Sequence, residues 1–401
     1  MNIFGKAALA TAALAASLTG ASAQVSDDVV RIGILGDMSG IYSGNSGPGS
    51  IAAAELAIED FGKTVLEKPI ELISADHQNK ADVASAIARR WYDTEGVDVI
   101  ADVVGTPIAL AVMDLARERD KAVLMTHGLS SDLSGKDCSA VSVQWPVNTY
   151  AIAQIVGRGL LEQGKKTFFF ITVDFAFGHQ LQRDITAAVE AGGGKVLGGS
   201  MHPLGTSDFS SLLLTASASG ADAIVLANAG GDTMNTIKQA KEFGIQERGQ
   251  AIAGLIALNE MKALGRETAA GLVGPVAWYW SQDDDSRAFS RRFFERVGSM
   301  PTDYHAGVYS AVKHYLRGVE KAGGDSGKAA VDAMKTLPVD DFFAPGGTVR
   351  ADGRLLKDLY LIAAKPADTD AEEWDVADVI TSLPGDVVFQ TIEAGGCPLA
   401  K

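Results

Sequence analysis

The chain alternates short apolar segments with longer amphipathic ones, and this alternation constrains its fold more than any other feature. Residues 29–36 (VVRIGILG) predict a strand, and residues 49–61 (GSIAAAELAIEDF) predict a helix with an Ala, Leu and Ile face. The same succession of strand and helix continues to residue 127. Apolar strands separated by amphipathic helices are typical of a parallel sheet covered on both faces. We therefore expect an α/β fold.

The alternation then restarts, which predicts a second lobe. Residues 148–164 predict a helix, residues 166–172 (KTFFFIT) predict a strand, and the succession continues to residue 257. One boundary is expected near Val143–Thr149. Another is expected at residues 274–280 (GPVAWYW), where strand-like aromatic residues follow a Gly-Pro pair.

Three crossings between the two lobes are expected. The predicted division assigns residues 28–144 and 277–356 to the first lobe, and residues 145–276 and 357–401 to the second. A length of 401 residues is sufficient for two domains with their own cores. A chain that crosses three times forms a hinge, and the cleft between hinged lobes is a place to bind a small molecule.

The first 23 residues have the pattern of a secretory signal peptide. Lys6 precedes an Ala- and Leu-rich run that is too short to span a bilayer, and Ala21-Ser22-Ala23 is a small-x-small cleavage site. A buried first helix is the alternative, but the segment has no polar face. The sequence therefore predicts export, most simply to a bacterial periplasm, and no direct membrane insertion of the mature chain.

The charge of the chain argues against two classes of partner. The net charge is −15, and there is no Lys/Arg run. Nucleic acids and anionic membranes both require a positive surface. We therefore expect no nucleic acid among the partners.

Two cysteines, Cys138 and Cys397, lie in loop-like contexts. In an oxidising compartment such a pair most often forms a disulfide, which would tie the C-terminus to a much earlier loop. A metal site is disfavoured because neither cysteine has a nearby His or Cys.

The glycine-rich segment between residues 33 and 49 raises the possibility of a phosphate site. Its glycines lack the G-x-G-x-x-G spacing of a dinucleotide fingerprint, and the chain has no G-x-x-x-x-G-K-[ST] loop. There is also no G-x-S-x-G elbow and no H-E-x-x-H pair. The sequence therefore gives no positive indication of a cofactor, a metal or an enzyme, and we interpret the segment as a wall of a pocket.

Several motifs resemble those of one family and occur in the same order. They are residues 30–60 (VRIGILGDMSGIYSGNSGPGSIAAAELAIED), 103–135 (VVGTPIALAVMDLARERDKAVLMTHGLSSDLSG), 174–181 (DFAFGHQL), 305–316 (HAGVYSAVKHYL) and 350–365 (RADGRLLKDLYLIAAK). Together they resemble the type I, branched-chain-amino-acid-binding-like substrate-binding proteins of ABC importers. The resemblance implies two Rossmann-like lobes joined by a three-segment hinge, a solute held between them, and membrane permease subunits as partners.

The resemblance also implies where a solute carboxylate is held. Amino-acid binders of the family use hydroxyls and backbone amides of two loops, which match Gly105-Thr106 and His127-Gly128 here. Thr106 opens a predicted helix, whose N-terminus suits an anion. An ordinary N-cap role for Thr106 and a core role for His127 remain alternatives.

One departure from the family concerns the solute's ammonium group. Amino-acid binders that resemble this chain carry a glutamate where our alignment places Ile256. A desolvated ammonium without a carboxylate costs on the order of several kcal/mol. This weakens the amino-acid interpretation, although Asp174 is an alternative ammonium partner.

Aromatic residues complete the predicted site. Phe175, Phe177, Tyr42 and Tyr279 are candidates for stacking on a flat ligand, with core packing as the alternative. Ser43 and Asn228 complete the candidate set. We expect a binding protein for an aromatic or apolar carboxylate of benzoate or phenylpropanoid type. Branched-chain amino acids are the alternative solutes, and a role in solute sensing is a further one.

Overall fold

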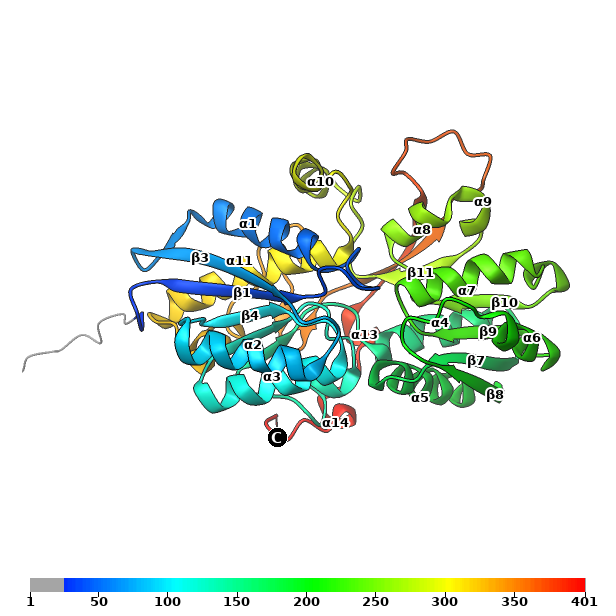
Figure 1. Cartoon of the computed structure of the whole chain (residues 1–401), viewed down its shortest axis with the longest axis horizontal. Helices are drawn as coiled ribbons and strands as arrows, with labels where there is room; N and C mark the ends of the chain where they lie inside the picture. The colour runs from blue at the N-terminus through cyan, green and yellow to red at the C-terminus, as the bar shows by residue number, and fades with distance from the viewer. Residues whose placement is uncertain (1–24, 401) are drawn as a thin grey trace, which may run out of the picture.

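The computed structural model describes residues 25–400, and the predicted signal peptide at 1–23 lies outside them. Figure 1 shows two lobes side by side, each with a sheet covered by helices, so the predicted α/β fold with two lobes is confirmed. Within residues 25–400, no helix is both long and apolar enough to cross a membrane.

The first lobe is built on a six-stranded sheet in the order β2-β3-β1-β4-β5-β6, parallel except for the edge pair β2–β3. Its strands are β1 (Val30–Gly36), β2 (Thr64–Val65), β3 (Lys68–Asp76), β4 (Val99–Asp102), β5 (Ala122–Met125) and β6 (Ser142–Gln144). Its helices are α1 (Pro48–Phe61), α2 (Ala81–Thr94), α3 (Thr106–Arg119), α10 (Asp284–Val297), α11 (Asp303–Ala322) and α12 (Gly327–Met334).

Alternation along β1 explains how both faces of this sheet are covered. Ile32 and Ile34 belong to the core that includes α1 and α11, whereas Leu35 belongs to the core beneath α2 and α3. Gly33 lies against Trp91 of α2, where a Cβ atom would come within 2.5 Å of the indole ring. Side chains on successive strand residues point to opposite faces, so the apolar strand is buried on both sides.

The second lobe repeats this plan around a parallel four-stranded sheet in the order β10-β9-β7-β8. Its strands are β7 (Thr167–Val173), β8 (Lys195–His202), β9 (Ala223–Ala227) and β10 (Ala251–Gly254). Its helices are α4 (Thr149–Glu162), α5 (Ala176–Ala191), α6 (Ser210–Ala218), α7 (Gly231–Glu242), α8 (Leu258–Leu264) and α9 (Arg266–Ala269).

A third, antiparallel sheet in the order β11-β14-β15 joins segments that are distant in sequence. It consists of β11 (Val273–Val276), β14 (Leu359–Ala364) and β15 (Ala377–Leu383), and the short pair β12 (Thr348–Val349) and β13 (Leu355–Leu356) precedes it. The remaining short helices are η1 (Ser131–Ser134), η2 (Gln246–Arg248), α13 (Gly385–Val388) and α14 (Ile392–Gly395).

Two buried cations tie the connecting segments together. The guanidinium of Arg354 donates to the carbonyl oxygens of Trp145 and Pro146, and the ammonium of Lys357 donates to that of Ala277. Because neither cation is exposed to water, these carbonyls are their main compensation for desolvation. The three connections are therefore held as one hinge.

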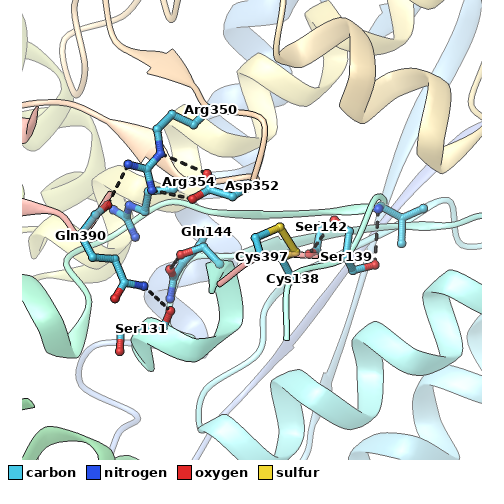
Figure 2. Close-up of a disulfide and its surroundings, with 12 residues drawn as sticks. Ser131, Cys138, Ser139, Ser142, Gln144, Arg350, Asp352, Arg354, Gln390 and Cys397 are labelled. Carbon is cyan, nitrogen blue, oxygen red and sulfur yellow. Dashed lines mark hydrogen bonds and ion pairs between the residues drawn. A yellow bond between two sulfur atoms is a disulfide. The ribbon is translucent and has the colours of Figure 1, made fainter. Parts of the chain in front are cut away.

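The predicted disulfide between Cys138 and Cys397 is present, with the two Cα atoms 5.6 Å apart. Figure 2 shows it beside a second attachment, in which Gln390 donates to the carbonyl of Ser131 and accepts from Arg350. The end of the chain, which the predicted division places in the second lobe, thus packs on η1 of the first lobe.

Candidate functional site

A pocket lies between the lobes, at the carboxyl ends of the strands of both parallel sheets. It is lined by Tyr42, Asn45, Val104, Gly105, Thr106, His127, Leu129, Phe175, Phe177, Ala229, Gly230, Leu255, Ala257, Glu260 and Tyr304. These residues follow β4, β5, β7, β9 and β10 in the chain, or come from the loop after β1 and from α11. Strand ends of open α/β sheets are where such folds bind ligands.

Helix N-termini converge on this pocket. The helices α3, α5, α7 and α8 begin at or next to lining residues. Each N-terminus carries unpaired N–H groups and the positive end of the helix dipole. The pocket is therefore electrostatically suited to a negatively charged group.

The N-terminus of α3 supplies the clearest anion donors. Gly105 precedes the helix with φ 95°, a left-handed conformation that glycine adopts without strain. The hydroxyl of Thr106 is buried and has no hydrogen-bond partner among the described residues. An unpaired buried hydroxyl is costly, so a ligand oxygen at this point would stabilise the site.

His127 lies beside this helix, with Nδ1 next to a buried carboxylate. Its Nδ1 lies 2.6 Å from Oδ1 of Asp102, a carboxylate with no exposed surface. The imidazole stacks on Tyr304 at a centroid separation of 4.3 Å, and Nε2 has no partner among the described residues. His127 and Thr106 thus present two available polar atoms from neighbouring strand ends.

The opposite wall is mostly apolar and comes from the second lobe. Phe175 and Phe177 flank the start of α5, and Leu255 and Ala257 follow β10. Together with Tyr42 and Tyr304 of the first lobe, the two phenylalanines surround the pocket with aromatic rings. Such walls favour a flat, apolar ligand body.

Glu260 is the carboxylate of this wall, and the sequence interpretation missed it. Its Oε2 accepts from the backbone N–H of Ala257 at 2.9 Å, and its Oε1 accepts from Nδ2 of Asn45 at 2.9 Å. Burial raises the pKa of Glu260 above its ordinary value, against the lowering effect of these two donors. The sequence interpretation considered Ile256 and Asp174 at this wall, and the carboxylate that lines the pocket is that of Glu260.

The hydrogen bond between Asn45 and Glu260 links the two lobes, and further hydrogen bonds between the lobes accompany it. Asn259 donates to the carbonyl of Gly44 at 2.8 Å, and the N–H of Gly231 donates to that of Ile41 at 3.3 Å. On the other side of the cleft, Ser131 of η1 donates to Asp184 of α5 at 2.9 Å. Both edges of the pocket are thus bridged by hydrogen bonds between the lobes.

Six of the predicted ligand residues line this pocket: Tyr42, Gly105, Thr106, His127, Phe175 and Phe177. Two others lie near it without lining it. The hydroxyl of Ser43 donates to Gly40 within its own loop, and buried Gly128 accepts from Gln144 through its carbonyl.

The remaining four predicted residues lie elsewhere. Asp174 is exposed and pairs with His179 at 2.9 Å, so it is not placed to meet an ammonium group in the pocket. Asn228 is buried and bonded to His202 and Thr233, and Ile256 belongs to the core of the second lobe. The hydroxyl of Tyr279 donates to the carbonyl of Ala377 at 2.9 Å, away from the pocket.

The fold and the pocket define a class: proteins that enclose a small solute between two hinged α/β lobes. The chain belongs to the periplasmic binding protein family, whose model matches residues 29–370. It is therefore a solute-binding protein and not an enzyme.

Solved structures agree with this assignment. A periplasmic binding protein from Burkholderia mallei is 40% identical, with a TM-score of 0.91 over 93% of this chain and 100% of that one. A branched-chain amino acid ABC transporter periplasmic ligand-binding protein from Burkholderia xenovorans LB400 is 37% identical, with a TM-score of 0.83 over the same shares. An ABC transporter solute-binding protein from R. palustris, in complex with benzoate, shares the fold at 19% identity, with a TM-score of 0.82 over 92% of this chain and 100% of that one.

Proposed function

We propose that this protein, exported to the periplasm by its first 23 residues, captures an aromatic or apolar carboxylate and delivers it to the permease of an ABC importer. One observation carries the proposal. Thr106 Oγ1 and His127 Nε2 are buried without hydrogen-bond partners among the described residues, and both residues line a pocket that combines an anion-favouring helix N-terminus with aromatic rings. The charged end of the solute would meet the first lobe, and its flat body the second.

Two solved structures bear on the class of solute, and they favour different solutes. The benzoate complex from R. palustris has this fold and holds a ligand of the proposed class. The more similar protein from Burkholderia xenovorans is named for branched-chain amino acid transport. Both names are compatible with an importer component.

A branched-chain or related amino acid is the second candidate, and Glu260 is the observation that favours it. Its carboxylate is 4% exposed and lines the pocket opposite the proposed anion donors. An ionised carboxylate is the partner that a desolvated ammonium group requires. In the leading proposal Glu260 instead serves the contact with Asn45 across the cleft.

A thermal-shift screen of refolded, ligand-stripped protein tests the proposal. The panel contains benzoate, 4-hydroxybenzoate, hydroxycinnamates, leucine and short-chain acids. A ligand at about one hundred times its Kd stabilises the folded state by ~2.7 kcal/mol, which raises the Tm visibly. A shift with the aromatic acids and none with leucine supports the leading proposal. The opposite result replaces it with the amino-acid function.

Glu260→Gln separates the two candidates further. Glutamine removes the charge and keeps one of the two oxygens that accept from Asn45 and from the N–H of Ala257. We expect this variant to retain binding of aromatic acids, whereas an amino acid would lose its ammonium partner. Loss of aromatic-acid binding in Glu260→Gln would count against the leading proposal.

A further inference from the structure

A buried carboxylate behind the pocket fixes the orientation of His127. Besides its contact with the imidazole, Asp102 accepts from Ser46 Oγ at 2.6 Å and from the N–H of Gly47 at 3.3 Å. Burial alone would raise its pKa, but His127 and the hydroxyls of Ser46 and Ser50 hold the pKa of Asp102 below its ordinary value. Asp102 is thus an anion that only accepts hydrogen bonds.

The local backbone shows that this arrangement is specifically built. Asp102 has φ 81° and Val103 has φ 51°, both in the left-handed region that non-glycine residues rarely occupy. A Cβ on Gly36 would come within 2.4 Å of Oδ2 of Asp102, so the absent side chain leaves room for the carboxylate. Strained residues of this kind persist where the surrounding structure holds them, commonly at functional sites.

An ionised Asp102 decides which nitrogen of His127 can change. The nitrogen that faces it, Nδ1, must carry a proton in order to donate. Only Nε2 then gains or loses a proton, and this atom is buried without a hydrogen-bond partner among the described residues, on a side chain that lines the pocket. Neutral Nε2 offers a lone pair, which repels a carboxylate. Protonated Nε2 donates a hydrogen bond to it.

We propose that capture of the anionic solute is coupled to protonation of His127, so that one carboxylate and one proton enter the pocket together. The proton comes from the solvent and binds Nε2, and no covalent bond of the solute forms or breaks. Asp102 is a positioning residue, because it acts through His127. This inference rests on the proposed function, since it takes the solute to be a carboxylate.

Other histidines near His127 do not compete for this proton. His77 follows β3, and His305 lies on the first turn of α11. Burial lowers the pKa of His77, and it lowers that of His305 to about 3. Both rings therefore remain neutral above pH 7.

Carboxyl and phenol groups face His127 as well. Burial raises the pKa of Asp303, at the start of α11, to about 6 and also raises that of Glu260. Tyr304, stacked on the imidazole, and Tyr42 both have pKa values raised by burial, so their hydroxyls keep their protons. Measurements from pH 7.0 upward thus avoid the titration of Asp303.

One group of the hinge, Lys357, titrates within the pH range of these measurements, so its contribution to proton uptake has to be subtracted. Burial lowers the pKa of Lys357 to about 7, and Asp303 acts against that effect. Wild type and His127→Gln share this lysine. A difference between the two proteins in the same buffers therefore removes the contribution of Lys357.

Isothermal titration calorimetry with benzoate tests the coupling. The titration is run at pH 7.5 in phosphate and in Tris, whose ionisation heats differ, and the Kd is followed from pH 7.0 to 8.5. We expect wild type to take up close to one proton and to lose up to tenfold in affinity per pH unit. His127→Gln, which retains an amide donor, should bind benzoate more weakly, with less proton uptake and a flatter pH profile.

His179→Gln is the matched control. His179 also pairs with an aspartate, Asp174, but on the surface and outside the pocket. It should behave as wild type in both measurements. Equal proton uptake in wild type and His127→Gln, or no uptake by wild type, overturns the inference while leaving the proposed function intact.

Failure of the proposed function gives a different pattern. If leucine binds and benzoate does not, the same two-buffer titration with leucine, also a carboxylate, decides the coupling. If neither binds, nitrogen-15 NMR of histidine-labelled protein decides it without a ligand. In the neutral imidazole of His127, the proton should lie on Nδ1. A neutral tautomer with its proton on Nε2 overturns the inference.

Discussion

The two walls of the pocket are built from the same kind of element but hold different chemistry. The first-lobe wall presents Thr106 and His127, and the latter is anchored by Asp102 behind it. The second-lobe wall presents phenylalanine and aliphatic side chains, with Glu260 as its carboxylate. Both walls stand at the carboxyl ends of parallel strands, so the difference comes from the residues that follow each strand and not from the fold.

The supporting hydrogen bonds of the two walls differ as well. Asp102 is held by Ser46, Gly47 and His127, all within the first lobe. Glu260 is held partly by Asn45, which belongs to the other lobe. The polar wall therefore keeps its geometry whether or not the cleft is closed, whereas the second wall is completed by closure. We infer that the first lobe captures the charged end and the second selects the body.

The largest effect is expected from Asp102→Asn. An amide cannot satisfy all the donors around this position, and removing one partner of a buried pair costs ~3–5 kcal/mol. We expect the free energy of unfolding, measured in urea, to fall by about that amount. A loss below ~1 kcal/mol would show that Asp102 does not hold the first-lobe wall of the pocket in a fixed geometry.

Thr106→Val comes next and concerns binding rather than stability. It removes a hydroxyl without a protein partner, so the Tm of the free protein should hardly change. Affinity for the aromatic acid should fall about 10- to 100-fold, corresponding to ~1–3 kcal/mol for a lost hydrogen bond. Thr215→Val on α6, far from the pocket, is the control. Unchanged affinity in Thr106→Val would remove this residue from the site.

A smaller effect is expected from Phe175→Ala in the second wall. Phe175 is partly exposed, and the loss of one stacking ring weakens binding about tenfold, or ~1.4 kcal/mol. Stopped-flow measurements should place this loss mainly in the dissociation rate, because the ring acts after capture. Phe294→Ala on α10, also outside the pocket, controls for loss of an aromatic residue. A slower association rate would contradict the order inferred for the two lobes.

The smallest effect on aromatic acids is expected from Glu260→Gln, with less than about a threefold change in Kd. The effect of this variant on stability is expected to depend on pH. Because the folded state raises the pKa of Glu260, ionisation disfavours folding at pH values above the ordinary glutamate range. The Tm of wild type relative to that of Glu260→Gln should therefore fall as the pH rises through and above that range. A relative Tm that rises with pH would mean that the charge stabilises the closed cleft.

The alternation of strands and helices was enough to predict both lobes, since each buried strand reads as an apolar run. Thr106 and His127 were instead predicted from the family resemblance, and both line the pocket because they follow two neighbouring parallel strands, whose carboxyl ends lie at one sheet edge. The pairing of Asp102 with His127 was not predicted, because the sequence does not show which side chains at the ends of two neighbouring strands lie against each other.

The misplaced residues have local physical causes. Ile256 points into the core of the second lobe, where Gly274 leaves space for it. Glu260 lies in the first turn of α8 and bends back to the N–H of Ala257, a placement that depends on where the helix begins. The hydroxyl of Tyr279 donates to the carbonyl of Ala377 on β15 and not toward the pocket. Because β15 lies beside Tyr279 only through the third sheet, the sequence gives no sign of this contact.

The disulfide has a consequence for what cleavage does to the chain. Cys138 and Cys397 are separated by 259 positions in the sequence, and the ring that their bond closes contains the strands and helices of the second lobe. A single proteolytic cut inside this ring would therefore leave two fragments that stay covalently joined until the disulfide is reduced.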